Sequence, residues 1–164
     1  MAGNENEAGL RDFLISSWGS FDTPGAVSLT RQLDGALVGN FKQGRWTLVD
    51  TYYVNPLSTL YSGREVVFRD GTAIWAASYH TAIPDEQLQN AVDGFYADKV
   101  APHPNPDFPV VSVDGIEDDT FREHHESLMP GVLTLAHFAV ASTITHKPSN
   151  QVALLDHTIG GWLS

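Results

Sequence analysis

The chain has 164 residues and a mass of 17.9 kDa, enough for one well-buried core and short for two. Hydrophobic residues make up 42% and charged residues 18%, a balance typical of a globular protein, and no apolar stretch approaches the roughly 20 residues of a membrane span. The 9 basic and 20 acidic residues give a formal charge of −11, which repels nucleic-acid backbones and acidic membranes. We therefore expect a single domain over residues 1–164 that binds neither nucleic acid nor membranes.

The chain contains no cysteine, which excludes disulfides, a thiolate nucleophile and cysteine-ligated metals. Its first residues lack the basic start, apolar middle and cleavage site of a secretory signal. These features predict a cytoplasmic location.

The first predicted elements are a helix and two strands. Apolar residues at helical spacing, with acidic residues before them, predict an opening helix that carries Leu10, Phe13, Leu14 and Trp18. After a break at Gly19–Gly25, residues 36–41 and 45–54 read as strands joined near Gln43-Gly44.

A hairpin is predicted around Asp70-Gly71. This pair lies between β-rich runs at 65–69 and 73–81, and Asp-Gly in that position favours a two-residue type I′ turn. With Arg69 opposite Thr72, regular pairing gives the hairpin two distinct faces. The core face is expected to carry Val66, Phe68, Trp75, Ala77 and Tyr79, and the mixed face Glu65, Val67, Arg69, Ile74, Ala76, Ser78 and His80.

A second helix is predicted over residues 84–99. Pro84 and two acidic residues mark its start, and Leu88, Val92, Phe95 and Lys99 form a stripe along one side. The proline-rich segment 102–109 follows as a loop.

The second half of the chain resembles the first in pattern. A shift of 77 positions lays residues 61–67 on 138–144 and His80-Thr81 on His157-Thr158. Two β-rich halves, 1–100 and 110–164, would then pack together, with a second hairpin turn at 147–150. The predicted class is α+β, mainly antiparallel sheet, with the N-terminal helix and the helix near 84–99.

Short motifs resemble the bacterial domain of unknown function 5680 family across roughly residues 8 to 163. They are Asp50-Thr51-Tyr52, Tyr61 to Val67, Arg69-Asp70-Gly71, Trp75, Tyr79-His80 and the closing Asp156 to Gly161. His80-Thr81 replaces the family's usual Tyr-Gly, and Ser142 stands where the repeat would have a glutamate. The family has no established chemistry, but some members are fused behind a helix-turn-helix regulator, which implies ligand sensing. This chain shows no such helix-turn-helix segment.

Three residues are candidate catalytic groups. Asp50 shares a strand face with Trp46, Leu48 and Tyr52, so desolvation would favour its protonated form and suit it to acid or base chemistry. Glu65 and His80 lie on the mixed hairpin face, where Glu65 would orient the imidazole of His80 and the imidazole would transfer the proton. The structural alternatives are that Asp50 is a buried, hydrogen-bonded aspartate without a catalytic role and that Glu65 is an exposed charge opposite a neighbouring strand.

The candidate ligand-binding residues are Tyr52, Tyr79, Ser78, Trp75 and His157. Tyrosine hydroxyls would donate to a developing enolate or alkoxide, although ordinary packing explains most aromatics in strands, Trp75 above all. His124 and His125 are adjacent and diverge on any regular element, so no metal site is expected. No phosphate loop, dinucleotide fingerprint or nucleophile elbow is present in the sequence.

These observations favour a small-molecule-binding protein, a cofactor-free isomerase, cyclase or dehydratase of specialised metabolism that moves protons within an apolar, oxygenated molecule. Two alternatives remain open. One is a non-catalytic ligand-binding or sensory module that uses the same pocket. The other is a dimerisation or structural domain, in which the mixed hairpin face forms the interface of a homodimer.

Overall fold

The fold is built on one antiparallel sheet. A computed structural model of the protein describes residues 2–21, 26–54, 60–131 and 133–163. Its eight strands are ordered β1-β2-β3-β4-β5-β8-β7-β6. They are β1 (Ser28–Arg31), β2 (Leu37–Gln43), β3 (Trp46–Val54), β4 (Leu60–Arg69), β5 (Thr72–Ala82), β6 (Phe121–Ser127), β7 (His137–His146) and β8 (Gln151–Trp162). The helices are α1 (Ala2–Phe21) and α2 (Gln89–Phe95), the latter flanked by the short helical turns η1 (Glu86–Leu88) and η2 (Tyr96–Val100). The predicted α+β class is confirmed.

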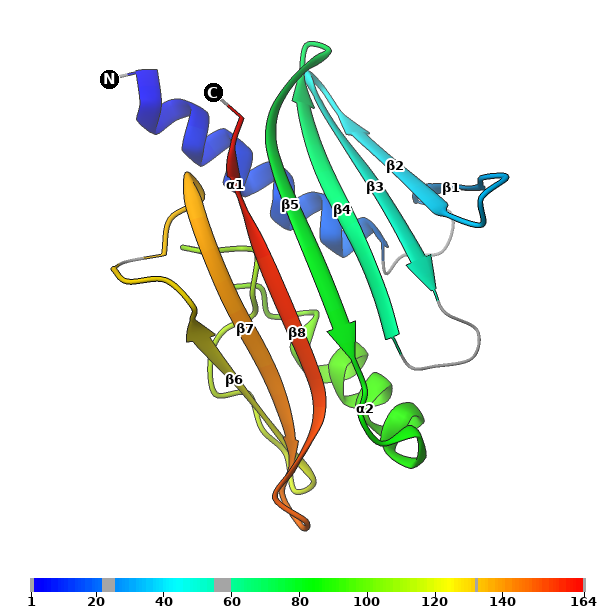
Figure 1. Ribbon diagram of the computed structural model, residues 1–164. Coiled ribbons are helices and arrows are strands. Elements are labelled where there is room, and N and C mark those ends of the chain that lie inside the picture. The colour runs from blue at the N-terminus through cyan, green and yellow to red at the C-terminus, as the bar shows by residue number, and fades with distance from the viewer. Residues whose placement is uncertain (1, 22–25, 55–59, 132, 164) are drawn as a thin grey trace.

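Both helices lie on the same side of the sheet, which we call the covered face; the other side is the open face (Figure 1). On α1, the predicted apolar stripe is buried, with Leu10, Phe13 and Leu14 at most 2% exposed. It packs over β3, β4 and β5 in a cluster that includes Leu48 and Trp75. Burial of this stripe stabilises α1 far more than its intrinsic helix propensity does.

The helix α2 covers the other half of the sheet. Val92, Phe95 and Val100 pack in a second cluster, with Ile144 and Leu154 from the last two strands. The first cluster also contains Phe138 of β7, so it extends beyond β3, β4 and β5. None of the helices among the described residues is long and apolar enough to cross a membrane.

The sheet contains two similar meanders, but the predicted 77-position alignment holds only in part. The alignment of 61–67 with 138–144 is wrong by two residues, because Ser62 is opposite His80 whereas the residue opposite His157 is Ala141. The units β3-β4-β5 and β6-β7-β8 each form a meander, and they join through the antiparallel pairing of β5 with β8. His80 and His157, 77 positions apart, face each other directly in that pairing. The two units are therefore related by an approximate twofold axis that crosses the sheet at this pair of histidines.

The hairpin turn is as predicted, but the faces of the hairpin are not. Asp70 and Gly71 both have positive φ, 51° and 81°, as a type I′ turn requires, and Arg69 is opposite Thr72. An irregularity between Val67 and Phe68 then shifts the register by one residue. Because successive side chains alternate between faces, the shift moves Glu65 and Val67 to the covered face with Trp75, and Val66 and Phe68 to the open face. The predicted sharing of a face by Glu65 and His80 is wrong.

The helix predicted over 84–99 begins at Glu86. Asp85 precedes it, and its carboxylate accepts a hydrogen bond from the backbone N–H of Gln87 at 2.9 Å. At the other end the chain winds into the wider π-helical turn η2. This wider turn buries Val100 and leaves Lys99 exposed, so the final position of the predicted stripe is wrong by one residue.

Candidate active site

Two carboxylates lie side by side on the covered face. Asp50 of β3 is directly opposite Glu65 of β4 in the strand register. Their side chains lie among large apolar groups, and the residues are only 7% and 9% exposed. Side chains directly opposite one another on antiparallel strands have Cβ atoms about 4.5–5.5 Å apart, so the two carboxylates are within direct electrostatic reach.

Each carboxylate accepts a hydrogen bond from an aromatic side chain. The Tyr79 hydroxyl donates to Asp50, with its oxygen 3.0 Å from Oδ1 and 3.2 Å from Oδ2. The indole Nε1 of Trp18, on α1, donates to Oε1 of Glu65 at 2.8 Å. The opening helix therefore contributes a side chain to the site as well as packing the core.

Gly63 allows Tyr79 to reach Asp50. Tyr79 is on β5 and Asp50 on β3, so the tyrosine side chain must cross the intervening strand β4, where Gly63 is its direct partner. A Cβ atom at Gly63 would lie only 2.4 Å from the Tyr79 hydroxyl and 2.7 Å from Cβ of Tyr52. The absence of a side chain at this position lets the phenol lie across the strand.

Burial separates the pKa values of the two carboxyls. Desolvation raises the pKa of Asp50 to about 6, and the hydrogen bond from Tyr79 opposes this shift. Desolvation and the nearby charge of Asp50 raise the pKa of Glu65 to about 8, against the hydrogen bond from Trp18. Between these values the pair holds one proton, mainly on Glu65, while Asp50 is ionised.

The polar groups continue across the sheet beside Tyr79. Asp156 on β8 accepts a hydrogen bond from Thr81 and another, at 2.8 Å, from Thr158. Burial raises the pKa of Asp156, and its charge in turn contributes to the raised pKa of Glu65. Asp156 therefore belongs to the same electrostatic unit as the carboxylate pair.

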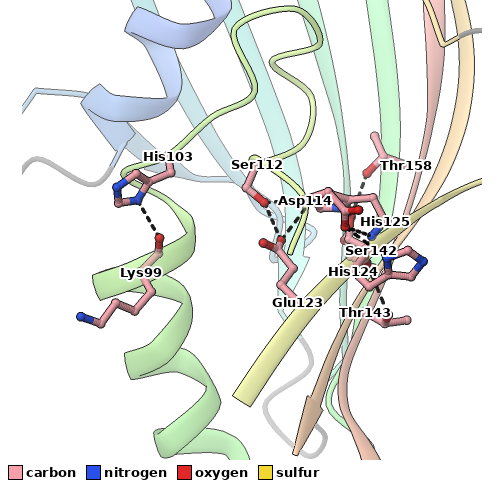
Figure 2. A network of polar contacts seen from close by, with 11 residues as sticks. Lys99, His103, Ser112, Asp114, Glu123, His124, His125, Ser142, Thr143 and Thr158 are labelled. Atoms are coloured by element: carbon pink, nitrogen blue, oxygen red, sulfur yellow. Dashed lines mark hydrogen bonds and ion pairs between the residues drawn. The ribbon is translucent and has the colours of Figure 1, made fainter. Parts of the chain in front are cut away.

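A second polar cluster lies in the other half of the sheet, between β6, β7 and the segment that precedes β6 (Figure 2). His125 contacts Ser142 through Nδ1 at 2.8 Å and Ser112 through Nε2 at 3.0 Å. The Ser112 hydroxyl donates to Oε1 of Glu123 at 2.6 Å, and within the described part of the chain Oε2 of Glu123 is buried without a hydrogen-bond partner. These contacts form one consistent chain of donors, in which Ser142 donates to a neutral His125 and the chain ends on Glu123.

Burial governs the ionisation of this second cluster as well. It raises the pKa of Glu123 to about 7 and lowers the pKa of His125. Ser142 lies 77 positions after Glu65, but it is not the structural counterpart of Glu65. Glu65 is opposite Ala77, and the residue opposite Leu154, 77 positions after Ala77, is Ile144. The approximate twofold axis therefore does not relate the two polar clusters residue by residue.

The structure brings together some of the predicted site residues and separates others. Asp50, Glu65, Tyr52 and Tyr79 share the covered face around the carboxylate pair. His80, Ser78 and His157 lie on the open face, where all three are exposed. Trp75 is fully buried in the core, stacks with Phe138 and donates its indole N–H to the Leu135 carbonyl at 3.0 Å, which agrees with its expected packing role.

Trp18 and Asp156 belong to the site but are not identified as site residues by the sequence. The sequence places Trp18 in an apolar helix stripe, and nothing in that pattern shows that its indole N–H contacts Glu65. Asp156 is exactly 77 positions after Tyr79, so the repeat carries a signal for its location but none for its chemistry.

An open groove of about 600 Å³ lies on the open face over β3, β4 and β5. Its lining combines apolar side chains, hydroxyls and one cation and comprises Val49, Thr51, Tyr53, Ser62, Gly63, Arg64, Val66, Phe68, Ser78 and Tyr79. Gly63 and Tyr79 also line this groove, but Asp50 and Glu65 do not, because the carboxylate pair lies on the covered face. Within the described residues no group of three or more histidine and acidic side chains is arranged to hold a metal ion.

Comparisons of the chain with protein-family models, with curated proteins and with solved structures find no match. The resemblance to the domain of unknown function 5680 family stays a prediction.

Proposed function

We propose that the protein is an enzyme that transfers protons within a small molecule, with Asp50 and Glu65 as the acid and base and without an organic cofactor. The observation that carries this proposal is the buried carboxylate pair, whose pKa values of about 6 and about 8 lie on either side of neutrality. Pairs of acids whose environments separate their pKa values are suited to simultaneous acid and base roles. The reaction classes that fit are isomerisation, cyclisation and dehydration.

The roles of the two carboxyls follow from their charge near pH 7. Ionised Asp50 would accept a proton from carbon or oxygen, and protonated Glu65 would return one to another atom of the same substrate. The Tyr79 hydroxyl, whose pKa is raised mainly by burial, stays protonated. Its single hydrogen, which bonds to Asp50 in the free protein, would turn to a developing enolate or alkoxide once Asp50 has accepted a proton. The half-buried Tyr52 borders the same position.

A test of this proposal needs no knowledge of the natural substrate. We expect the protein, incubated in D₂O with a panel of ketones, aldehydes and hydroxy ketones, to incorporate deuterium beside the carbonyl of at least one compound, measured by mass spectrometry. Asp50→Asn should lower that rate about 10²–10⁴-fold, the usual contribution of a positioned general base. Asp98→Asn, on an exposed helical turn, is the control and should leave the rate unchanged. Equal rates in wild type and Asp50→Asn would exclude Asp50 as the base.

A second candidate function is a non-catalytic ligand-binding or sensory module, which the open-face groove favours. A volume of about 600 Å³ lies within the range of small-molecule sites. Its apolar floor at Val49, Val66 and Phe68, beside the guanidinium of Arg64, suits an amphipathic anion.

The fluorescent probe 8-anilinonaphthalene-1-sulfonate has an aromatic body and one sulfonate, and it tests this groove directly. We expect the native protein to bind it and Arg64→Gln to weaken binding about five- to tenfold, the loss of one charge-assisted contact. Arg122→Gln, an exposed arginine on β6, is the matched control. Unchanged affinity in Arg64→Gln would place the probe elsewhere.

A further inference from the structure

The two histidines at the centre of the sheet form a pair of exposed side chains on the open face. His80 of β5 and His157 of β8 are directly opposite in the strand register. Both side chains are exposed, and the approximate twofold axis passes between them. The repeat thus places two identical side chains next to each other, although they are 77 positions apart in sequence.

Their separation suits a shared metal ion. Directly opposed side chains of an antiparallel pair have Cβ atoms about 4.5–5.5 Å apart. Imidazole nitrogens bind Zn²⁺ at about 2.0–2.1 Å, so two rings that lean toward each other from such positions can share one ion above the sheet. The neighbours on either side of the pair, Ser62 next to His80 and Ala141 next to His157, have small side chains that leave room for the ion.

Neither imidazole is engaged elsewhere within the described part of the chain. The imidazoles of His103, His124, His125 and His146 all contact a hydrogen-bonding group, whereas those of His80 and His157 have no such partner there. Two unengaged imidazoles that face each other across a strand pair are ready to accept a cation.

The surrounding charge also favours a cation. The chain has a formal charge of −11, which raises the local concentration of positive ions.

We propose that His80 and His157 form a binding site for one divalent transition-metal ion, with water completing its coordination. Imidazole ligands suit Cu²⁺, Ni²⁺ and Zn²⁺, and the general order of affinities predicts that Cu²⁺ binds most tightly. Ser62 lines the open-face groove and is directly opposite His80, so the ion lies beside the groove. Its open coordination positions are then available to a ligand bound in the groove.

Titration calorimetry of the metal-free protein with CuCl₂, NiCl₂ and ZnCl₂ at pH 7.5 tests the proposal. We expect one site per chain, with Cu²⁺ bound most tightly. His80→Gln and His157→Gln should each weaken binding at least about tenfold, because each removes one of only two protein ligands. Lowering the pH to 5.5 should weaken binding in the wild type, since imidazole must be neutral to coordinate.

His124→Gln and His137→Gln are the matched controls, because both histidines are exposed and neither is at the central strand pair. They should bind as the wild type does. Circular dichroism of each variant checks that the fold is intact. The proposal is overturned if the wild type binds none of the three ions, if His80→Gln and His157→Gln bind like the wild type, or if only a control variant loses the site.

Discussion

Replacing Glu65 with glutamine should flatten the dependence of stability on pH between about 7 and 8.5 and raise the free energy of unfolding at the alkaline end. The pKa of Glu65 is about 8 in the folded protein, against a reference of 4.5, so the folded state holds this proton more tightly than the unfolded state. That contribution to stability is fully present below pH 4.5 and is lost as the pH rises toward 8. Glutamine keeps an acceptor for Trp18 and never ionises.

The expected effect is large because each unit of pKa difference corresponds to about 1.4 kcal/mol. Between pH 5 and 8.5 the wild type should lose a few kcal/mol of unfolding free energy through Glu65 alone. Asp50 and Glu123, with folded pKa values of about 6 and about 7, also lower the free energy of unfolding as the pH rises, but at lower pH than Glu65 does. The lowered pKa of His125 has the opposite effect, since it raises the free energy of unfolding as the pH rises through the titration of this residue. Glu123 still titrates just above pH 7, so the contribution of Glu65 is read from the difference between the wild type and Glu65→Gln.

Urea unfolding at half-unit steps from pH 5 to 9 measures the effect. Glu126→Gln is the matched control, because Glu126 is an exposed glutamate on β6 and its replacement should leave the pH profile as in the wild type. Asp50→Asn adds a second check, since removal of the neighbouring charge should move the midpoint for Glu65 to lower pH. If wild type and Glu65→Gln decline equally above pH 7, Glu65 does not hold its proton in the folded protein.

Gly63→Ala should destabilise the protein by about 2–4 kcal/mol and release Tyr79 from Asp50. The added methyl group would lie 2.4 Å from the Tyr79 hydroxyl and 2.7 Å from Cβ of Tyr52. Cβ of Tyr52 is bonded directly to the backbone, so a side-chain rotation of Tyr52 cannot relieve this contact. Tyr79 must move, and Asp50 then loses its hydrogen-bond donor. Because that bond lowers the pKa of Asp50, the pKa should rise above about 6 in the variant.

Denaturant unfolding measures the stability, and carbon-detected NMR of the aspartate carboxyl measures the pKa. Gly94→Ala is the control for glycine replacement as such, because Gly94 is in α2 and a Cβ there meets nothing within 4 Å. It should be neutral or stabilise the helix by about 0.5–1 kcal/mol. A Gly63→Ala variant that is as stable as Gly94→Ala, with an unchanged Asp50 pKa, would show that Tyr79 does not depend on the glycine.

The sequence by itself determined the local elements. The spacing of Leu10, Phe13 and Leu14 is a property of nearby residues, and so is the turn at Asp70-Gly71, where both residues adopt the positive φ that the pair tolerates. The strands β2 to β5, and the hairpin of β7 and β8 with its turn at 147–150, were likewise found from pattern. The strands β1 and β6 were not predicted, because β1 is fully exposed and β6 is dominated by charged and imidazole side chains, so neither shows a strong apolar alternation.

The tertiary structure alone decided which side chains meet. A one-residue irregularity beside Val67 reverses the faces of β4 relative to β5, and this change takes Glu65 away from His80. The regular pairing of β3 with β4 places Glu65 opposite Asp50. Such a shift depends on the packing of the whole sheet against α1, because strand residues alternate between faces and the buried face sets the register. The contacts of Trp18 with Glu65 and of Tyr79 with Asp50 likewise join distant parts of the chain. The pKa values of the two carboxyls depend on their burial, which arises only when the whole sheet packs against α1.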